Sequence, residues 1–393
     1  MSEIKETLHL YDKDAYATDF SAVVLSCEPI EKENMTMYQV ILNQTLFFPE
    51  EGGQSPDKGT IDGIEVKDVQ IKNGVIRHTL AAAVEAGKTV SGTIDWRHRF
   101  YNMQQHSGEH IFSGLVHTKF GFNNVGFHLS DQIVTMDFDG VLAQNEIEEI
   151  EYAVNEAIAE NIEVQVSFPS KEELASLEYR SKIEIEGQVR IVTIPGYDVC
   201  ACCAPHVHRT GEIGMLKVMS VQNYKGGVRI SILCGFRALM AFREKSQIIN
   251  ELTNQLTCGQ EMLVDNITKQ KAANQTLKSQ LISAKQELMG YKLSEIPSEQ
   301  RNVFIFDKGM DSNVMRNAIN KLVEQHDGIC AMFSGDDAEG YNYIIGSKST
   351  DCKMVANELR QKHGARGGGS NVMIQGSVQA AKEAIEKTLS ELS

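Results

Sequence analysis

The sequence predicts an α+β protein of several parts: a small N-terminal β-barrel, a mixed α+β domain, a helical arm and a small C-terminal α/β domain. Three observations predict this class. Residues 6–95 contain short strand-like runs separated by Gly, Asn and Asp turns. Residues 236–294 contain no proline and repeat apolar residues at the spacing of a long helix. After Pro297, strand-like and helix-like runs alternate.

The domain boundaries follow these changes in periodicity. The chain has 393 residues, 42% of them hydrophobic, which is enough to bury more than one core. The N-terminus lacks the basic and then apolar layout of a signal peptide, and no apolar run is long enough to span a membrane. We therefore expect a cytoplasmic protein with no membrane partner. The predicted parts are 1–95 (barrel), 96–235 (mixed domain), 236–294 (helical arm) and 295–393 (C-terminal domain).

The mixed domain begins with a predicted helix over 99–120, where apolar residues recur at helical spacing. Gly108 in the middle of this run argues mildly against a helix. A strand pair is predicted over 125–140 and an amphipathic helix over 144–161. The segment 162–234 is predicted to mix helix and strand and to end in the strand-like run "GGVRISILCGF".

The sequence leaves open both the shape of the helical arm and its role. Its apolar residues fit one long helix or two paired helices, with Gly259 at the turn. The net charge of −15 argues against a nucleic-acid partner, but residues 236–292 hold eight Lys or Arg against five acids. The arm is therefore either a spacer or a basic arm that contacts nucleic acid. Its repeating residues are Ile249, Leu252, Leu256, Leu263, Ile267, Leu277, Leu281, Ala284 and Leu288.

The run "QQHSGEH", residues 104–110, places His106 and His110 four residues apart, with Glu109 beside the second. On a helix this spacing puts both side chains on one face, about 5–6 Å apart at Cβ. The pair alone permits a metal site, an acid-base pair or coincidence, because eleven histidines give such spacing by accident. The run "DVCACCAPHVHRTGEIG", residues 198–214, adds Cys202 and His206 at the same spacing.

A thiolate with two or three imidazoles is the donor set that zinc prefers. In a reducing compartment, clustered cysteines also favour metal or redox chemistry over a disulfide framework. The sequence therefore predicts one Zn²⁺ held by His106, His110, Cys202 and His206.

These motifs resemble the HxxxH and CxxxH zinc motifs of alanyl-tRNA editing proteins, a domain that also occurs in alanyl-tRNA synthetases and whose free-standing members are called AlaX. "FFPEEGGQSPDKGTI" resembles the family's glycine-rich barrel motif, and "GGVRISILCGFRAL" its exit strand. The predicted arm and "GARGGGSNVMIQGSV", residues 364–378, resemble the tail of long-form AlaX with its DHH-associated C-terminal domain. The resemblance covers nearly the whole chain.

The resemblance implies a zinc-containing editing domain over 96–235 and a trans-editing enzyme. Such an aminoacyl-tRNA deacylase hydrolyses the ester of mischarged tRNA(Ala), typically seryl- or glycyl-tRNA, so tRNA is the implied partner. The DHH motif of phosphoesterases is absent, and no ATP-binding activation domain precedes the barrel, so neither of those activities is expected. The glycine-rich C-terminal run implies contact with tRNA, or a homodimer through the C-terminal domain or the arm. Its residues are Arg360, Lys362, Arg366, Gly367, Gly368 and Gly369.

The four predicted ligands raise a chemical difficulty, because four protein ligands close a tetrahedral zinc site, and closed sites are the structural type. Three readings stay open. Zinc expands its coordination or loses a ligand when substrate enters, it positions the terminal adenosine, or it is purely structural. The first two are favoured, because the similar family centres its substrate pocket on the metal.

Three further residues are predicted to be catalytic, and each has a structural alternative. Glu109 is either a general base or a residue that supports the metal ligands. Gln54, with Gly52 and Gly53, either brings donors to the ester or forms a tight barrel turn. His128 either lines the pocket or is an ordinary strand histidine.

The CxxxH loop departs from the family's usual CGGTH, because Cys203, Ala204 and Pro205 replace two glycines and a threonine. Pro205 lacks a backbone N–H and Cys203 adds bulk, which puts seryl specificity in doubt more than the metal. Cys200 or Cys203 can also replace a ligand, or act as a nucleophile beside a histidine. Two other functions stay open: a non-catalytic, zinc-stabilised RNA-binding protein, and a hydrolase of another aminoacyl-tRNA or aminoacyl ester.

Overall fold

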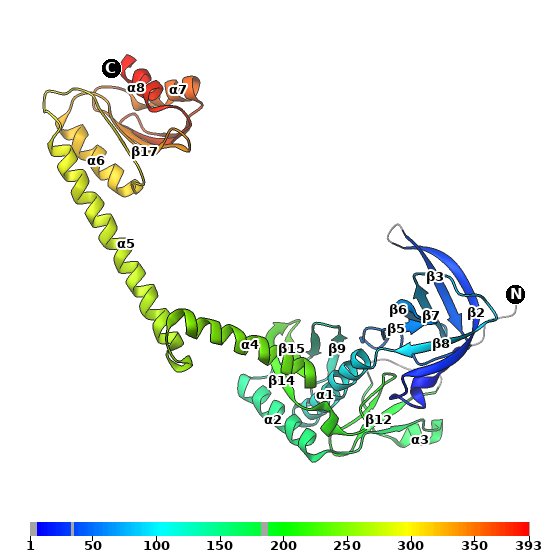
Figure 1. Ribbon diagram of the computed structural model, residues 1–393. Helices are drawn as coiled ribbons and strands as arrows, with labels where there is room; N and C mark the ends of the chain where they lie inside the picture. Colours follow the sequence, from blue (N-terminus) through cyan, green and yellow to red (C-terminus); the bar gives the residue numbers. More distant parts are fainter. Residues whose placement is uncertain (1–5, 33–34, 182–187, 393) are drawn as a thin grey trace. The chain divides into compact units, whose positions relative to one another are not determined.

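The computed structural model describes residues 6–32, 35–181 and 188–392. It has the mixed α+β character that the sequence predicts, and it divides into two units, Met1–Ile249 and Asn250–Ser393. Figure 1 shows the strands of the first unit around helix α1 and a separate layered domain in the second. The finer division into four parts stays a prediction.

Six antiparallel strands close the N-terminal barrel in the order β2-β3-β7-β6-β5-β8 (Figure 1). β2 closes the ring because its first half pairs with β8 and its second half with β3. Alternate residues point inward, so apolar side chains such as Val40, Leu42 and Ile76 are buried in the interior. The barrel strands, with the small parallel pair β1 and β4, are β1 Leu8–His9, β2 Asp19–Lys32, β3 Met35–Leu42, β4 Gln44–Thr45, β5 Gly59–Ile61, β6 Ile64–Lys72, β7 Val75–Leu80 and β8 Thr89–Ile94.

Helix α1, Trp96–Phe120, is the central element of the mixed domain. The predicted helix is confirmed but begins three residues earlier, because the Asp95 carboxylate accepts from His98 N at 3.1 Å and caps the first turn. Gly108 does not break it. A Cβ there would lie 2.4 Å from Cys234 Sγ, so this glycine lets α1 pack closely against strand β15.

Two sheets and helix α2 pack against α1, and the mixed domain also contains the short helix α3. The predicted strand pair and amphipathic helix are confirmed as β9, β10 and α2. A four-stranded antiparallel sheet has the order β14-β15-β10-β9, and a three-stranded sheet has the order β11-β12-β13. The elements are β9 Asn124–Leu129, β10 Val134–Phe138, α2 Gln144–Glu160, β11 Gln165–Ser167, α3 Lys171–Ser176, β12 Ile191–Ile194, β13 Asp198–Ala201, β14 Leu216–Tyr224 and β15 Gly227–Cys234.

A buried ion pair fastens α1 to the barrel. Arg99 has no exposed surface, and its Nε lies 3.0 Å from both carboxylate oxygens of Asp57. The same guanidinium donates to Leu46 O at 2.6 Å and to Ala15 O at 3.0 Å, so all of its charge is compensated by barrel atoms. The barrel and the mixed domain therefore form one continuous unit around the first turns of α1.

The arm contains two helices rather than one. α4, Gly235–Leu256, and α5, Leu263–Ser294, are separated by a turn that includes Gly259 and a 3-10 helix, Gln260–Met262. Their pairing as a coiled coil stays a prediction. Across the described residues, no helix is both long and apolar enough to cross a membrane.

The C-terminal domain is a five-stranded sheet of order β16-β17-β18-β20-β19 with three helices, and it confirms the predicted alternation of helix and strand. Only β16 and β17 pair in parallel. Met289 and Leu293 of α5 pack into one of its two cores. Its elements are β16 Val303–Asp307, α6 Ser312–Gln325, β17 Cys330–Asp336, β18 Gly340–Gly346, α7 Cys352–His363, β19 Arg366–Gly369, β20 Met373–Val378 and α8 Lys382–Glu391.

Candidate metal centre

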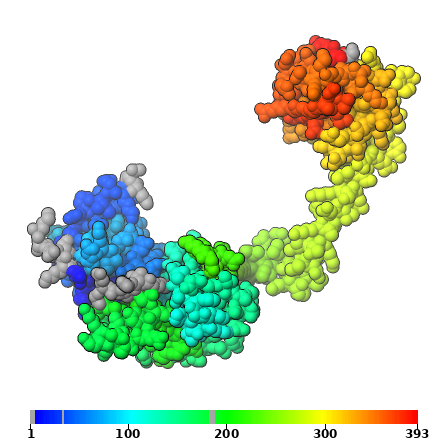
Figure 2. All heavy atoms as spheres, turned by 180° about the vertical axis from the view of Figure 1, so that it is seen from behind, coloured from blue at the N-terminus to red at the C-terminus, as the bar shows by residue number. Residues whose placement is uncertain are grey.

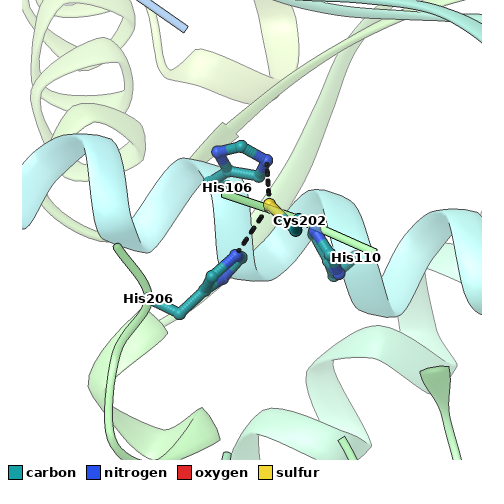
Figure 3. A group of neighbouring side chains, drawn as sticks. All are labelled: His106, His110, Cys202 and His206. Atoms are coloured by element: carbon teal, nitrogen blue, oxygen red, sulfur yellow. Dashed lines mark hydrogen bonds between the residues drawn. The ribbon is translucent and has the colours of Figure 1, made fainter. Parts of the chain in front are cut away.

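Three imidazoles and one thiol converge in the mixed domain. His106 and His110 project from α1, and Cys202 and His206 project from the loop after β13 (Figure 3). One donor atom from each of the four lies within 4.8 Å of the others. The Cys202 sulfur lies 3.6 Å from His106 Nε2 and 3.4 Å from His206 Nε2. The structure thus brings together all four residues that the sequence selects as metal ligands.

Each of the three histidines has its other nitrogen beside an oxygen atom. His106 Nδ1–H donates to Gln54 Oε1 at 2.8 Å, and His206 Nδ1 lies 3.0 Å from Ser107 Oγ. His110 Nδ1 lies 2.9 Å from the Asp198 carboxylate. These contacts orient the rings and leave their Nε2 atoms toward Cys202, which is the usual arrangement behind metal-binding histidines.

The ionisation of Cys202 and His206 suits a metal as well, whereas the pKa of His110, which burial alone would lower, is raised well above its usual value by Asp198 and Cys202. Burial alone raises the pKa of a thiol, but the imidazoles of His106 and His206 hold the pKa of Cys202 well below its usual value. Burial lowers the pKa of His206 to about 3, so its ring is neutral. A thiolate beside neutral imidazole nitrogen is a ligand set of the kind that zinc prefers.

Gln54 reaches this group from the barrel through a tight turn. Glu51 and Gln54 exchange both backbone hydrogen bonds, and Gly53 between them has φ +83°. A Cβ at Gly53 would lie 2.3 Å from Phe127 O, so only glycine lets the turn pack against β9. Leu129 N donates to Gly53 O at 2.7 Å and locks the turn in place. The second reading, a tight barrel turn, therefore describes the motif, and the turn carries Gln54 to His106. The role of Gln54 toward an ester stays a prediction.

Glu109 is buried on α1 next to the group. Its Oε1 accepts from Ser113 Oγ at 2.7 Å and from Asn124 Nδ2 at 2.6 Å. Its Oε2 lies 3.9 Å from His110 Nε2. The carboxylate is thus held beside a ligand, a place that suits a proton acceptor or a supporting role.

His128 is not brought to the group. It is exposed on β9, where neighbouring residues point to opposite faces of the strand. Phe127, the residue before it, packs its ring 4.8 Å from that of His106. The placement therefore does not support a pocket-lining role for His128.

The other two cysteines are not among the four donors, although the Cys200 sulfur lies within 4.8 Å of donor atoms of His110 and Asp198. Burial raises the pKa of Cys200 to about 11, and its thiol donates to Ala201 O. Burial, followed by the nearby Cys202 thiolate and Glu51, raises the pKa of Cys203. Without a metal, both thiols therefore stay protonated at neutral pH, which disfavours them as nucleophiles.

Asp198, Ser107 and Arg180 were missed by sequence reasoning. Arg180 holds Asp198 through two bonds, Nε to Oδ1 at 2.7 Å and Nη2 to Oδ2 at 2.9 Å. Ser107 stands beside a predicted ligand and could have been suspected, whereas no spacing links Arg180 or Asp198 to His110. A cavity of about 640 Å³ borders Asp198 and Arg180, and it also borders Asn124, which bonds Glu109.

The predicted RNA-binding residues lie on α7 and β19 of the C-terminal domain. Arg366–Gly369 form the exposed edge strand of the sheet. Arg360 Nη2 donates to Gly367 O at 3.1 Å, so these two are neighbours. Lys362 is engaged elsewhere, at 2.9 Å from Glu391 and 3.6 Å from Glu358.

Comparison with known proteins agrees with this architecture. Residues 4–98 match the family described as tRNA synthetases class II (A). Residues 189–231, which include Cys202 and His206, match the family described as the threonyl and alanyl tRNA synthetase second additional domain. The barrel is thus similar to part of the class II tRNA synthetases, and the segment that carries Cys202 and His206 is similar to the additional domain.

More particularly, the chain is a homologue of the alanyl-tRNA editing proteins, and the resemblance seen in its motifs is confirmed. The alanyl-tRNA editing protein Aarsd1 of Danio rerio is 29% identical over 97% of each chain. An alanine--tRNA ligase of Natronomonas pharaonis is 28% identical over 99% of this chain and 45% of the ligase. The solved C-Ala domain of Aquifex aeolicus alanyl-tRNA synthetase is 22% identical and covers 23% of this chain and 90% of that one. Its TM-score of 0.21 is too low to establish a shared fold.

Proposed function

We propose that this protein is an aminoacyl-tRNA deacylase that acts in trans on tRNA(Ala) charged with the wrong amino acid, serine or glycine. The observation that carries the proposal is the buried group of three imidazoles and one thiol, with donor atoms within 4.8 Å of one another. It lies in a chain similar over 97% of its length to an alanyl-tRNA editing protein. The fold alone would not define the reaction, because one fold hosts many functions.

The donor group fits Zn²⁺, because zinc prefers thiolate and imidazole ligands and the four donor atoms lie within 4.8 Å of one another. Hydrogen-bond partners behind the rings also orient the imidazoles. His106, His110, Cys202 and His206 would hold the ion. When bound, zinc supplies a positive charge that polarises an ester carbonyl or lowers the pKa of a water molecule.

The protein's own residues would orient the ester and move its proton. Gln54 is buried, and within the described part of the chain its Nε2 has no hydrogen-bond partner while its Oε1 holds His106. We propose that this amide donates to the ester carbonyl as charge develops on it, and its unpartnered Nε2 supports this role. Glu109 is the proposed proton acceptor for the attacking water, because its carboxylate is buried and held beside His110.

The loop that carries Cys202 and His206 is the proposed determinant of the amino acid removed. Arg190 Nη1 donates to Cys202 O at 2.7 Å and to Ala204 O at 2.9 Å, which holds the loop in one shape. Cys203 and Pro205 differ from the family's usual loop, so we propose that they shift the preference between serine and glycine.

Release of amino acid from seryl-, glycyl- and alanyl-tRNA(Ala) by the purified protein tests this function. We expect loss of serine or glycine with alanine spared, and at least a hundredfold slower release by His110→Ala, since catalytic metal centres contribute several kcal/mol. Lys119→Ala is the control, because Lys119 is exposed on the same helix and pairs with Glu149 outside the donor group. It should keep full activity.

One rival function is favoured by the closed donor set, because four protein ligands are typical of structural zinc. In that case the protein binds tRNA without turnover. Zinc at one equivalent and tRNA binding, with all three esters intact, would favour this rival. Release from another aminoacyl-tRNA would instead point to a hydrolase of different specificity.

We also propose that the C-terminal unit binds tRNA through Arg360, Arg366 and the glycine strand, and that two copies associate along α5. Figure 2 shows much of α5 uncovered before it reaches the C-terminal domain. Four apolar side chains at heptad spacing are exposed there, and Asn274 falls at an a position, where it favours parallel dimers. They are Leu277 (63% exposed), Leu281 (56%), Leu288 (51%) and Tyr291 (64%).

A further inference from the structure

Four aromatic rings form a cluster where the first turns of α1 meet the chain beyond His206. We call Tyr16, Trp96, Phe100 and His208 the aromatic cluster. The rings of Tyr16 and His208 are stacked at 3.9 Å and 20°, and those of Trp96 and Phe100 at 5.3 Å and 29°. Tyr16 joins the two pairs, because its ring lies 5.1 Å from that of Trp96. His208 is exposed and the other three rings are half-buried, so each keeps some surface open to solvent.

The aromatic cluster is connected to the candidate metal centre through two chain segments. His208 is two residues beyond His206, and Trp96 and His106 stand on the same helix. Ten residues of helix separate Trp96 from His106, a distance of about 15 Å along the axis at the rise of an α-helix. Stacked nucleotides advance about 3.4 Å each, so this distance corresponds to roughly four of them. A ligand that starts at the metal centre and passes the cluster would be about that long.

The charges next to the aromatic cluster permit a nucleic acid there. Three carboxylates next to the cluster already accept hydrogen bonds within the protein: Glu212 from the Tyr16 hydroxyl, Asp14 from Tyr16 N at 2.8 Å, and Asp95 from His98 N at 3.1 Å. Arg97 is exposed, and its guanidinium lies 5.3 Å from the centre of the Tyr101 ring. Among the described residues, its Nε donates to the Tyr101 hydroxyl at 2.7 Å. Its remaining donors can therefore reach a phosphate.

We propose that the aromatic cluster is a stacking surface for bases of the single-stranded 3′ end of tRNA, with Arg97 beside it as a phosphate contact. Aromatic rings bind single-stranded nucleic acid in this way because every base offers a flat face. The inference rests on the proposed function only in taking the RNA to be tRNA. It adds the path by which the aminoacyl end would reach the metal centre.

Trp96 makes a direct test available, because it is the only tryptophan in the chain. The full-length protein is titrated with uncharged tRNA(Ala) and with the same tRNA lacking its four 3′ nucleotides, while Trp96 emission is recorded. We expect saturable quenching by the intact tRNA and none by the shortened one. His208→Ala and Arg97→Ala should each weaken binding of the intact tRNA about fivefold or more. Both side chains are exposed, so these variants should fold normally.

His117→Ala is the matched control, since it removes an exposed histidine near the other end of α1. Three results would overturn the inference: equal quenching by both tRNAs, unchanged emission at concentrations where tRNA binds, or no binding. A protein that deacylates mischarged tRNA without any change in Trp96 emission would retain the proposed function and refute this inference. Quenching that needs the 3′ end, without deacylation, would support this inference and refute the proposed function.

Discussion

At the scale of single residues, the candidate metal centre depends on side chains behind the ligands. Gln54, Ser107 and Asp198 each stand beside the Nδ1 atom of one histidine. Asp198 is the only charged one of the three, and Arg180 fixes it from the other side. A carboxylate in this position increases the basicity of the ring and fixes its orientation.

Asp198→Asn should therefore weaken zinc binding by roughly tenfold or more, because it removes the negative charge behind His110 while keeping the side-chain shape. Competition between the metal-free protein and a chelator of known affinity measures this change. Asp137→Asn is the matched control, since Asp137 also makes two bonds to an arginine, Arg229, but is not in the donor group. Equal affinities of the two variants would contradict the role assigned to Asp198.

A second residue, His78, should make stability depend on pH. It is fully buried in the barrel, where its ring contacts Thr45 Oγ1 at 3.0 Å and Val40 O at 3.3 Å. Burial lowers its pKa from 6.5 to about 4. Below pH 6.5 the His78 side chain binds a proton in the unfolded chain, whereas in the folded chain it binds one only near pH 4. The stabilisation is complete above pH 6.5 and is lost as the pH falls toward 4, by up to about 3 kcal/mol.

Denaturant unfolding of the wild type and of His78→Gln at pH 7 and pH 4.5 checks this expectation. The glutamine can keep both hydrogen bonds but does not titrate, so its free energy of unfolding should fall less between the two pH values. The exposed His117→Gln variant should behave as the wild type does. An identical pH dependence for all three proteins would show that His78 is not responsible.

At the scale of elements, α1 brings the site together. It supplies two of the candidate ligands and, in addition, the supporting residues Ser107 and Glu109. Arg99 fastens it to the barrel, and Gly108 lets it pack against β15. Helix propensity alone disfavours a glycine at that position. The close approach to Cys234 explains why glycine is needed there.

Gly108→Ala should therefore lower the free energy of unfolding by about 2 kcal/mol, the usual range for overpacking, although alanine is the better helix former. Gly290→Ala in α5 is the matched control, because nothing lies within 4 Å of a Cβ placed there. That substitution should stabilise its helix by up to about 1 kcal/mol. Thermal unfolding followed by circular dichroism measures both. If Gly108→Ala instead raised the free energy of unfolding, α1 and β15 could move apart without loss of stability, which would contradict this expectation.

At the scale of the whole molecule, the chain contains a unit with the candidate metal centre and a unit with the glycine-rich edge strand. The proposed association along α5 would join two such chains. It uses side chains that the C-terminal domain leaves exposed, while Met289 on another face of the same helix is buried in that domain.

The double variant Leu281→Glu with Leu288→Glu should convert the protein from dimer to monomer, because it places charges in the heptad positions of the interface. Sedimentation equilibrium gives the mass directly. Ser279→Glu with Gln286→Glu is the matched control, since it adds the same charge at exposed positions outside the apolar stripe. A wild-type protein that is monomeric at all concentrations would refute the association, and zinc content should be the same in every variant.

The sequence by itself determined the class, the order of the elements and the four candidate ligands. Local patterns carry that information: alternating strands in the barrel, helical spacing over α1, and the two intervals of four that bring His106 to His110 and Cys202 to His206. The start of α1 was missed by three residues, because a cap depends on one side chain, Asp95.

Only the tertiary structure decided what stands behind the ligands. Asp198 stands on β13, Arg180 follows α3, and Gln54 lies in a barrel turn. No spacing in the sequence connects these three residues. The exposure of His128 likewise depends on which face of β9 points toward α1. Periodicity reports which residues of one element share a face, whereas contacts between elements distant in sequence are set by how those faces pack together.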